Sequence, residues 1–199
     1  VTGVFDIYRG MLDGTSELIF ESKLGHYARS ISPDGKYALI TESVGAAADN
    51  LYLLDLASKE VTTISKPPVA DYASHTLGGF EWRPDSTGFY FSTIFDREFG
   101  TIVYYDLKLG EFGRAFGKVF ESTGDVGNLQ LCGATGAGSY LFWKQNEDGF
   151  DSLQGFNLNT MRPIAMPDLP EGKYSLDCEG TDDAKLMVGI NGWQTPGEL

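Results

Sequence analysis

Residues 27–64 read YARSISPDGKYALITESVGAAADNLYLLDLASKEVTTI. Two apolar stretches flank a turn at Ser32-Pro33-Asp34-Gly35, and a loop covers Val44–Asn50. A third apolar stretch ends at Leu56, and a fourth covers Val61–Ile64. Pro, Asp and Gly mark turns, and short apolar runs between turns are typical of strands. The segment therefore predicts four short antiparallel strands.

The same unit recurs along the chain in two independent registers. The strand before the turn is marked, at intervals of 46 to 51 residues, by Ile31, Trp82, Cys132 and Cys178. The start of the third strand is marked, at intervals of 44 to 51 residues, by Ile7, Leu51, Ile102, Leu153 and Leu199. Four-stranded units with a period of about fifty residues are typical of β-propeller blades. We therefore predict an all-β fold, a β-propeller segment of four-stranded antiparallel blades.

The two registers divide the chain into three whole blades and a half-blade at each end, all within one propeller domain. The predicted units are residues 1–24, 25–68, 69–121, 122–170 and 171–199. The first half-blade holds the third and fourth strands of a blade, and the last holds the first and second. Either the two half-blades pair and close a four-bladed ring, or the chain is a segment of a larger propeller. The exposed edges of cut blades favour the segment, as does a start at Val1 rather than Met.

Charge and hydropathy exclude two classes of partner. The net charge is −13, with 28 acidic against 15 basic residues. Phosphate binding depends on clustered Lys and Arg, so we expect no nucleic-acid partner. The longest apolar runs are far shorter than the roughly 18 residues that span a membrane. We expect no membrane partner either.

The two cysteines, Cys132 and Cys178, occupy the same register of neighbouring units. Facing sheets pack about 10 Å apart, whereas a disulfide requires Cα atoms within roughly 7 Å. We therefore expect two free, buried thiols that act as small apolar side chains. Free thiols fit a reducing compartment, so the sequence favours the cytoplasm.

Residues that could carry chemistry are few. The sequence has no G-x-S-x-G, H-E-x-x-H or C-x-x-C motif, and its only histidines are His26 and His75. We expect both to have surface or hydrogen-bonding roles, and we predict no catalytic residue, metal site or cofactor. The segment Asn146–Gly149 predicts a tight turn rather than a calcium loop.

The three tryptophans differ in their surroundings. Trp82 and Trp143 lie in apolar strands, and we expect them in the core between blades. Trp193 lies in a polar loop at Asn191–Pro196, where a large aromatic side chain has less structural reason to be. It is the candidate residue for contact with a substrate or a neighbouring domain.

The order of these motifs is similar to that in the N-terminal propeller of the prolyl oligopeptidase family of serine peptidases, especially its acylaminoacyl-peptidase-like members. The resembling segments are Ser32–Lys36, Leu51–Leu56, Phe80–Asp85, Asn146–Gly149 with Leu153 after it, and Thr195–Leu199. The resemblance covers the whole chain as the latter half of such a propeller, and it covers no catalytic residue. Turns such as Arg83–Ser86 depart from the full Ser-Pro-Asp-Gly form.

The resemblance implies a non-catalytic propeller domain that caps an α/β-hydrolase domain of the same parent chain and admits only short peptides. The Ser-Asp-His triad of such a peptidase would lie elsewhere in the parent. The alternative is a stand-alone propeller scaffold that binds other proteins. A third class, a propeller enzyme with its own axial site, is the least favoured, because the inner strand positions are mostly apolar or small.

Overall fold

The computed structural model describes residues 5–23, 25–45, 48–64, 77–94, 98–110, 117–121, 123–133, 139–179 and 185–192. All regular elements in these ranges are β-strands. They are β1 (Ile7–Gly10), β2 (Ser16–Phe20), β3 (His26–Ile31), β4 (Tyr37–Gly45), β5 (Ala48–Asp55), β6 (Val61–Thr63), β7 (Leu77–Trp82), β8 (Gly88–Thr93), β9 (Thr101–Asp106), β10 (Gly117–Glu121), β11 (Asp125–Cys132), β12 (Tyr140–Glu147), β13 (Phe150–Asn157), β14 (Arg162–Pro163), β15 (Lys173–Glu179) and β16 (Lys185–Asn191).

The strands form five antiparallel sheets in which neighbours in sequence are neighbours in space. Three sheets have four strands, in the orders β3-β4-β5-β6, β7-β8-β9-β10 and β11-β12-β13-β14. The pairs β1-β2 and β15-β16 form separate sheets of two strands. This confirms the predicted fold class of three whole blades with a half-blade at each end.

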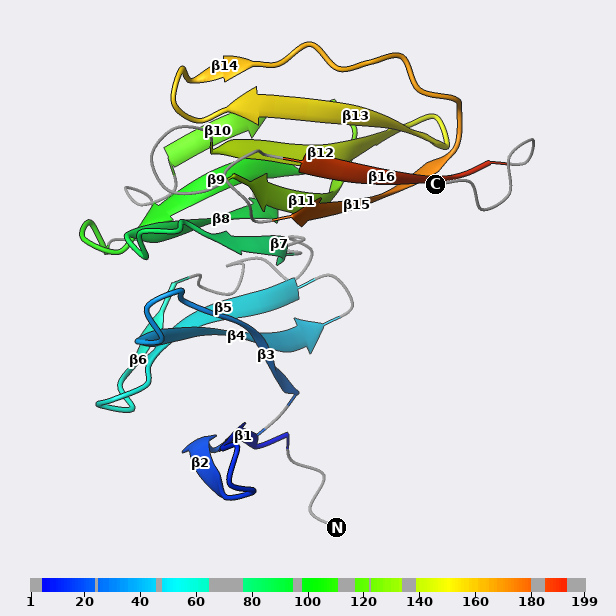
Figure 1. Ribbon diagram of the computed structural model, residues 1–199. Helices are drawn as coiled ribbons and strands as arrows, with labels where there is room; N and C mark the ends of the chain where they lie inside the picture. Colours follow the sequence, from blue (N-terminus) through cyan, green and yellow to red (C-terminus); the bar gives the residue numbers. More distant parts are fainter. Residues whose placement is uncertain are drawn as a thin grey trace.

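Figure 1 shows β1–β2 at the bottom of the view, with β3–β6 above it, and β15–β16 among the strands of the upper part, away from β1–β2. In the described part of the chain the two half-blades therefore do not pair to close a four-bladed ring. The assignment of all 199 residues to one propeller domain stays a prediction.

The turn between the first two strands of a blade also links that blade to the next. In the first whole blade, Ser32 Oγ donates to Asp34 Oδ1 at 2.7 Å, and Gly35 has a φ of 70°. In the second, Ser86 takes the position of that glycine and has a φ of 57°. Its hydroxyl accepts a hydrogen bond of 3.0 Å from the Asp34 amide. A residue that departs from the Ser-Pro-Asp-Gly form thus joins two blades.

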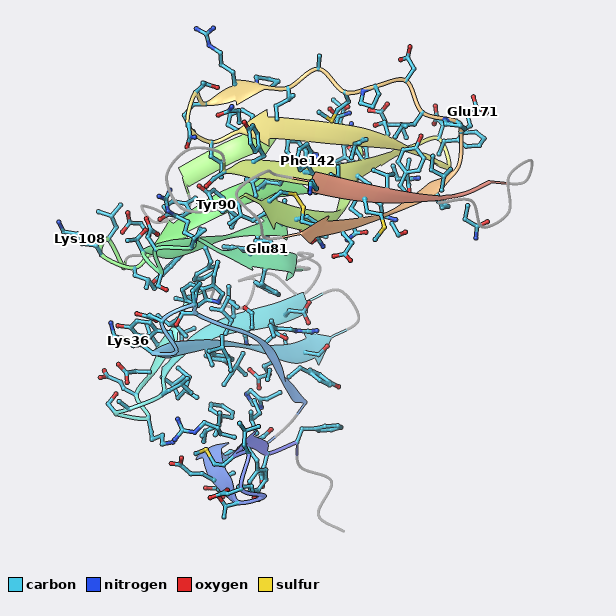
Figure 2. All side chains as sticks on the ribbon, viewed as in Figure 1. Lys36, Glu81, Tyr90, Lys108, Phe142 and Glu171 are labelled. Carbon is cyan, nitrogen blue, oxygen red and sulfur yellow. A yellow bond between two sulfur atoms is a disulfide. The ribbon has the colours of Figure 1, made fainter. Side chains whose placement is uncertain are left out.

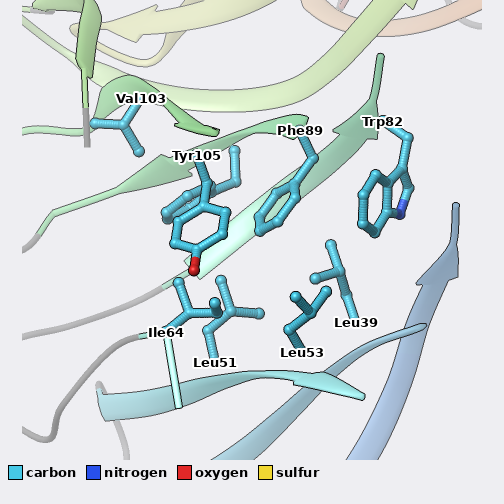
Figure 3. Close-up of a cluster of buried hydrophobic side chains, with 9 residues drawn as sticks. Leu39, Leu51, Leu53, Ile64, Trp82, Phe89, Val103 and Tyr105 are labelled. Atoms are coloured by element: carbon cyan, nitrogen blue, oxygen red, sulfur yellow. The ribbon is translucent and has the colours of Figure 1, made fainter. Parts of the chain in front are cut away.

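Apolar side chains fill the space between successive blades. Figure 3 shows one such cluster, in which side chains from two sheets face each other; its buried members are Leu39, Leu51, Leu53, Ile64, Trp82, Phe89, Phe91, Val103 and Tyr105. Trp143 is buried in the next cluster, between the second and third whole blades. Full burial of such a side chain contributes about 1.5–3 kcal/mol. The prediction that Trp82 and Trp143 belong to the core between blades is confirmed.

A buried carboxylate holds the last sheet against the third whole blade. The side chain of Asp151, on β13, is 1% exposed. Its Oδ2 accepts hydrogen bonds from the Tyr174 amide at 2.8 Å and from Lys144 Nζ at 3.1 Å. Its Oδ1 accepts from Asn146 Nδ2 at 2.8 Å and from Lys173 Nζ at 3.4 Å. We call this group the Asp151 clasp.

Candidate functional site: the junctions of the inner strands

The first strand of each whole blade carries an irregularity at an equivalent place. The strand pairing shifts between Ala28 and Ser30, between Gly78 and Glu81, and between Gly127 and Gln130. Such bulges turn side chains out of the sheet and are frequent at functional sites. They lie on β3, β7 and β11, the strands by which consecutive blades contact each other most directly. We call the first strand of each blade its inner strand.

At the second irregularity the backbones of β7 and β11 approach closely. Gly79 has a φ of 59°, and a Cβ atom at this position would lie 2.6 Å from the Cβ of Leu129. Only glycine fits such a position without displacing the neighbouring strand. The close approach brings the next side chain on this face of β7, Glu81, against β11.

Glu81, labelled in Figure 2, is a carboxyl group whose pKa is raised by its surroundings. Burial raises its pKa from 4.5 to about 7, although a hydrogen bond from the backbone amide of Leu131 acts in the opposite direction. A carboxyl group that titrates near neutral pH can exchange a proton under physiological conditions, which makes it a functional candidate. Its contact with Leu131 also gives it a structural role, as a link between two blades.

A hollow of about 370 Å³ opens at the start of the same two strands. Its lining is rich in glycine and includes the polar residues Ser92, Thr93, Asp125 and Asn128. Ser92 Oγ donates to the Gly78 carbonyl at 3.0 Å. Hydroxyl, amide and carboxylate groups around a space without large side chains can hold a small polar group. The junction of β7 and β11 is thus the candidate functional site.

We expect Glu81→Gln to stabilise the chain at alkaline pH. The native carboxyl group binds its proton more tightly than the unfolded one. Glu81 therefore lowers the free energy of unfolding progressively as the pH rises from 4.5 to about 7. Glutamine removes this cost, and the variant should gain up to about 3 kcal/mol above pH 8 and nothing below pH 4. Urea unfolding from pH 4 to 9 measures the difference. The exposed Glu60→Gln is the control, and a gain for Glu81→Gln that does not change with pH would contradict the assignment.

At the junction of β11 and β15, the side chain of Asn128 makes the two hydrogen bonds that the backbone of a paired strand would otherwise make. Asn128, which has a φ of 49°, accepts a hydrogen bond of 2.8 Å from the Leu176 amide through Oδ1. Its Nδ2 donates to the Leu176 carbonyl at 3.3 Å. Asparagine tolerates the left-handed conformation better than most residues. The two hydrogen bonds of Asn128 therefore connect β11 directly to β15 of the next sheet.

The expectation of two free thiols is wrong, because Cys132 and Cys178 form a disulfide. Their Cα atoms are 5.4 Å apart. The separation of about 10 Å that applies to flat facing sheets fails here, because inner strands converge, as the Asn128–Leu176 pairing shows. The reason for favouring a reducing compartment is thereby removed. Disulfides persist mainly in oxidising environments.

His26 lies in a buried polar cluster that the sequence did not reveal. Its Nδ1 is 2.8 Å from Ser22 Oγ, and its Nε2 is 3.7 Å from Glu42 Oε1. Serine, histidine and carboxylate are the groups of a hydrolytic triad, but Ser22 is only 3% exposed and a substrate carbonyl cannot reach it. Glu42 accepts further hydrogen bonds from Asn50 Nδ2 and the Tyr52 hydroxyl. The cluster ties the first half-blade to the first whole blade, in agreement with the hydrogen-bonding role expected of His26.

The other sequence candidates have different outcomes. Asn146–Gly149 is a tight turn, as predicted: Glu147 pairs with Phe150, and both Asp148 and Gly149 have positive φ. Trp193, His75 and the Thr195–Leu199 segment lie outside the described residues. The substrate-contact role of Trp193 therefore stays a prediction.

The sequence pattern did not indicate Glu81 as a functional candidate. Its neighbours, Phe80 and Trp82, make the local pattern look like a strand with one solvated face, which would carry Glu81. Only the packing of the next blade buries it. Among the described residues, no three His, Cys, Asp or Glu side chains gather as they would around a metal ion. The same part of the chain holds no helix that could span a membrane.

Comparisons with known proteins support the fold. No family model matches the sequence, and no curated protein matches it significantly. A solved prolyl endopeptidase, one of two analysed for the role of inter-domain dynamics in catalysis and specificity, is similar over 86% of this chain, with 20% identity and a TM-score of 0.63. TolB from Acinetobacter baumannii is similar over 95%, with 12% identity and a TM-score of 0.56.

The chain spans 27% of the prolyl endopeptidase chain and 46% of the TolB chain. At these identities the likeness is one of fold: a succession of propeller blades that resembles part of both proteins.

Proposed function

We propose that these 199 residues are part of the propeller domain of a prolyl-oligopeptidase-type serine peptidase. The observation that carries the proposal is the similarity of 86% of the chain to a prolyl endopeptidase, at a TM-score of 0.63. The order of the motifs from Ser32–Lys36 to Thr195–Leu199 supports the same family independently.

In this role the chain is a filter rather than a catalyst. Its partner is an α/β-hydrolase domain of the same parent chain, which supplies the Ser-Asp-His triad, and its substrates are short peptides. A propeller excludes folded proteins only if its blades do not separate. Neighbouring blades here are linked close to the inner strands by Trp82 Nε1 with Ser30 Oγ at 3.1 Å, by the Glu81–Leu131 contact and by the disulfide. These links fit a rigid entrance.

A stand-alone scaffold that binds other proteins is the second candidate. It is supported by the similarity to TolB, which extends over 95% of this chain. The disulfide adds to it, since cross-links of this kind are common in proteins outside the cytosol. This candidate requires no hydrolase domain.

Fluorophosphonate labelling of the native protein from its source tests the proposal. The protein is detected with an antibody raised against this segment, and a heat-denatured sample is the control for labelling without an active serine. We expect a labelled band well above 21.7 kDa, because the triad must lie in the same polypeptide. An unlabelled band near 21.7 kDa would favour the scaffold. A large unlabelled band would overturn the peptidase assignment.

A further inference from the structure

Successive sheets are linked near their inner strands by different kinds of contact. Between β3 and β7, Trp82 Nε1 donates a hydrogen bond of 3.1 Å to Ser30 Oγ. Between β11 and β15, the side-chain amide of Asn128 bonds the backbone of Leu176, and the disulfide adds a covalent link. None of these groups changes its charge between pH 5 and pH 8. Between β7 and β11, the link is made by Glu81, which can ionise.

The surroundings of Glu81 suit a neutral carboxyl group. Tyr90, its partner across the sheet on β8, is 4% exposed, and Leu129 on β11 is 2% exposed (Figure 2). Both belong to the apolar cluster between the second and third whole blades. The carboxyl group accepts a hydrogen bond from the backbone amide of Leu131, which is a neutral donor. An ionised carboxylate in such surroundings is unfavourable, and hydration would remove the penalty.

The ionisable groups on the strands next to Glu81 do not neutralise it. Arg83, which follows β7, donates two hydrogen bonds to Asp85, at 3.1 and 2.9 Å. The phenol of Tyr90 on β8 lies beside the same guanidinium, and its pKa is raised mainly by burial. On β11 the ionisable side chain is Asp125, at the start of the strand, and its charge has the same sign.

The strand β3, which also packs against β7, provides no counter-ion either. Arg29 Nε donates to Thr41 Oγ1 at 2.6 Å. His26 belongs to the buried polar cluster with Ser22. Among the described residues, ionised Glu81 therefore has no partner of opposite charge, and water is the group that can stabilise it.

We propose that the junction of β7 and β11 is a proton-operated latch, closed while Glu81 is protonated and released when Glu81 ionises. The hollow of about 370 Å³ extends between Gly78 and Gly79 on one strand and Asn128 on the other, so solvent can enter when the strands part. The raised pKa of Glu81, about 7, sets the release near neutral pH. The links on either side do not titrate in this range and confine the opening to one junction. The inference does not depend on the peptidase assignment.

Hydrogen exchange of the Leu131 amide reports the latch directly, because this amide bonds Glu81. It is measured by NMR on the purified 199-residue chain from pH 5 to pH 8, and each rate is divided by the intrinsic rate at that pH. The pKa of Glu81 is about 7 in the closed junction and returns to 4.5 in the open one, so the opening constant should rise roughly 70-fold over this range.

Two other amides that bond side chains across sheets are internal references. The Leu176 amide bonds Asn128 Oδ1, which does not titrate. The Tyr174 amide bonds Asp151, whose pKa lies below 3.8, so that this carboxyl group stays ionised. Neither amide should follow the rise at Leu131. An equal rise at all three would indicate unfolding of the whole chain and would overturn the latch.

Glu81→Gln separates the proton from the contact, because glutamine keeps an oxygen that can accept from the Leu131 amide but cannot ionise. Its opening constant at Leu131 should be the same at pH 5 and pH 8. The exposed Glu60→Gln is the matched control and should retain the wild-type rise. Circular dichroism confirms that both variants are folded. A constant value at Leu131 in the wild type, or a rise that persists in Glu81→Gln, would contradict the proposal.

Discussion

Asp151→Ala is expected to lower the free energy of unfolding by about 3–5 kcal/mol, the range for removing one partner of a buried ion pair. The substitution leaves the Tyr174 amide without its acceptor, and Asn146 Nδ2 keeps only its hydrogen bond to the Phe150 carbonyl. It also leaves the partly buried Lys144 next to a space that no longer holds a carboxylate. Urea unfolding at pH 7 measures the loss. The exposed Asp168→Ala, in the segment between β14 and β15, is the control and should change stability by less than about 0.5 kcal/mol.

The pH dependence of this loss distinguishes the ion pair from simple packing. Burial by itself raises the pKa of Asp151, but the hydrogen bonds from Tyr174, Asn146 and Lys144 lower it below its ordinary value of 3.8. The ionised carboxyl group therefore stabilises the fold above pH 3.8, and this contribution disappears as the pH falls through the lowered native pKa. The gap between wild type and Asp151→Ala should narrow below pH 4. A gap of the same size at pH 3 and pH 7 would indicate that lost packing explains the whole effect.

The blade repeat could be predicted from the sequence because each strand and turn is encoded locally. The turn at Ser32–Gly35 and the hairpin at Asn146–Gly149 have the residues that their backbone conformations require. The faces of the blades are also encoded locally, since Trp82 and Phe89 alternate with residues that face the next blade.

Contacts between inner strands could not be predicted in the same way. The distance between two neighbouring blades depends on where both blades converge, and no single repeat encodes that distance. This is why Cys132 and Cys178 looked too far apart, and why Glu81 looked like an exposed residue of an alternating strand. Gly79 was a partial signal, since a glycine within a strand often marks a bulge or a close approach of another backbone.

Reduction of the Cys132–Cys178 disulfide is expected to destabilise the chain by about 4 kcal/mol. The bond closes a loop in which its cysteines are 46 residues apart, and the chain-entropy estimate for a loop of this length gives about that value. For a chain of this size the loss corresponds to a decrease in Tm of roughly 10 °C. Calorimetry with and without a phosphine reductant measures it. The double variant Cys132→Ala with Cys178→Ala should melt at the reduced temperature and should not respond to the reductant.

The effect should also be local. Besides the disulfide, β15–β16 is attached to the third whole blade by the Asp151 clasp, by Asn128 and by a cluster that includes Leu153, Tyr174 and Leu176. Reduction should therefore increase hydrogen exchange first in β15–β16 and leave β3–β6 unchanged, because the latter sheet shares none of these contacts. The sequence contains only two cysteines, so no alternative pairing can form within one chain. Two free thiols in the unreduced native protein, found by alkylation and mass spectrometry, would contradict the assignment of this bond.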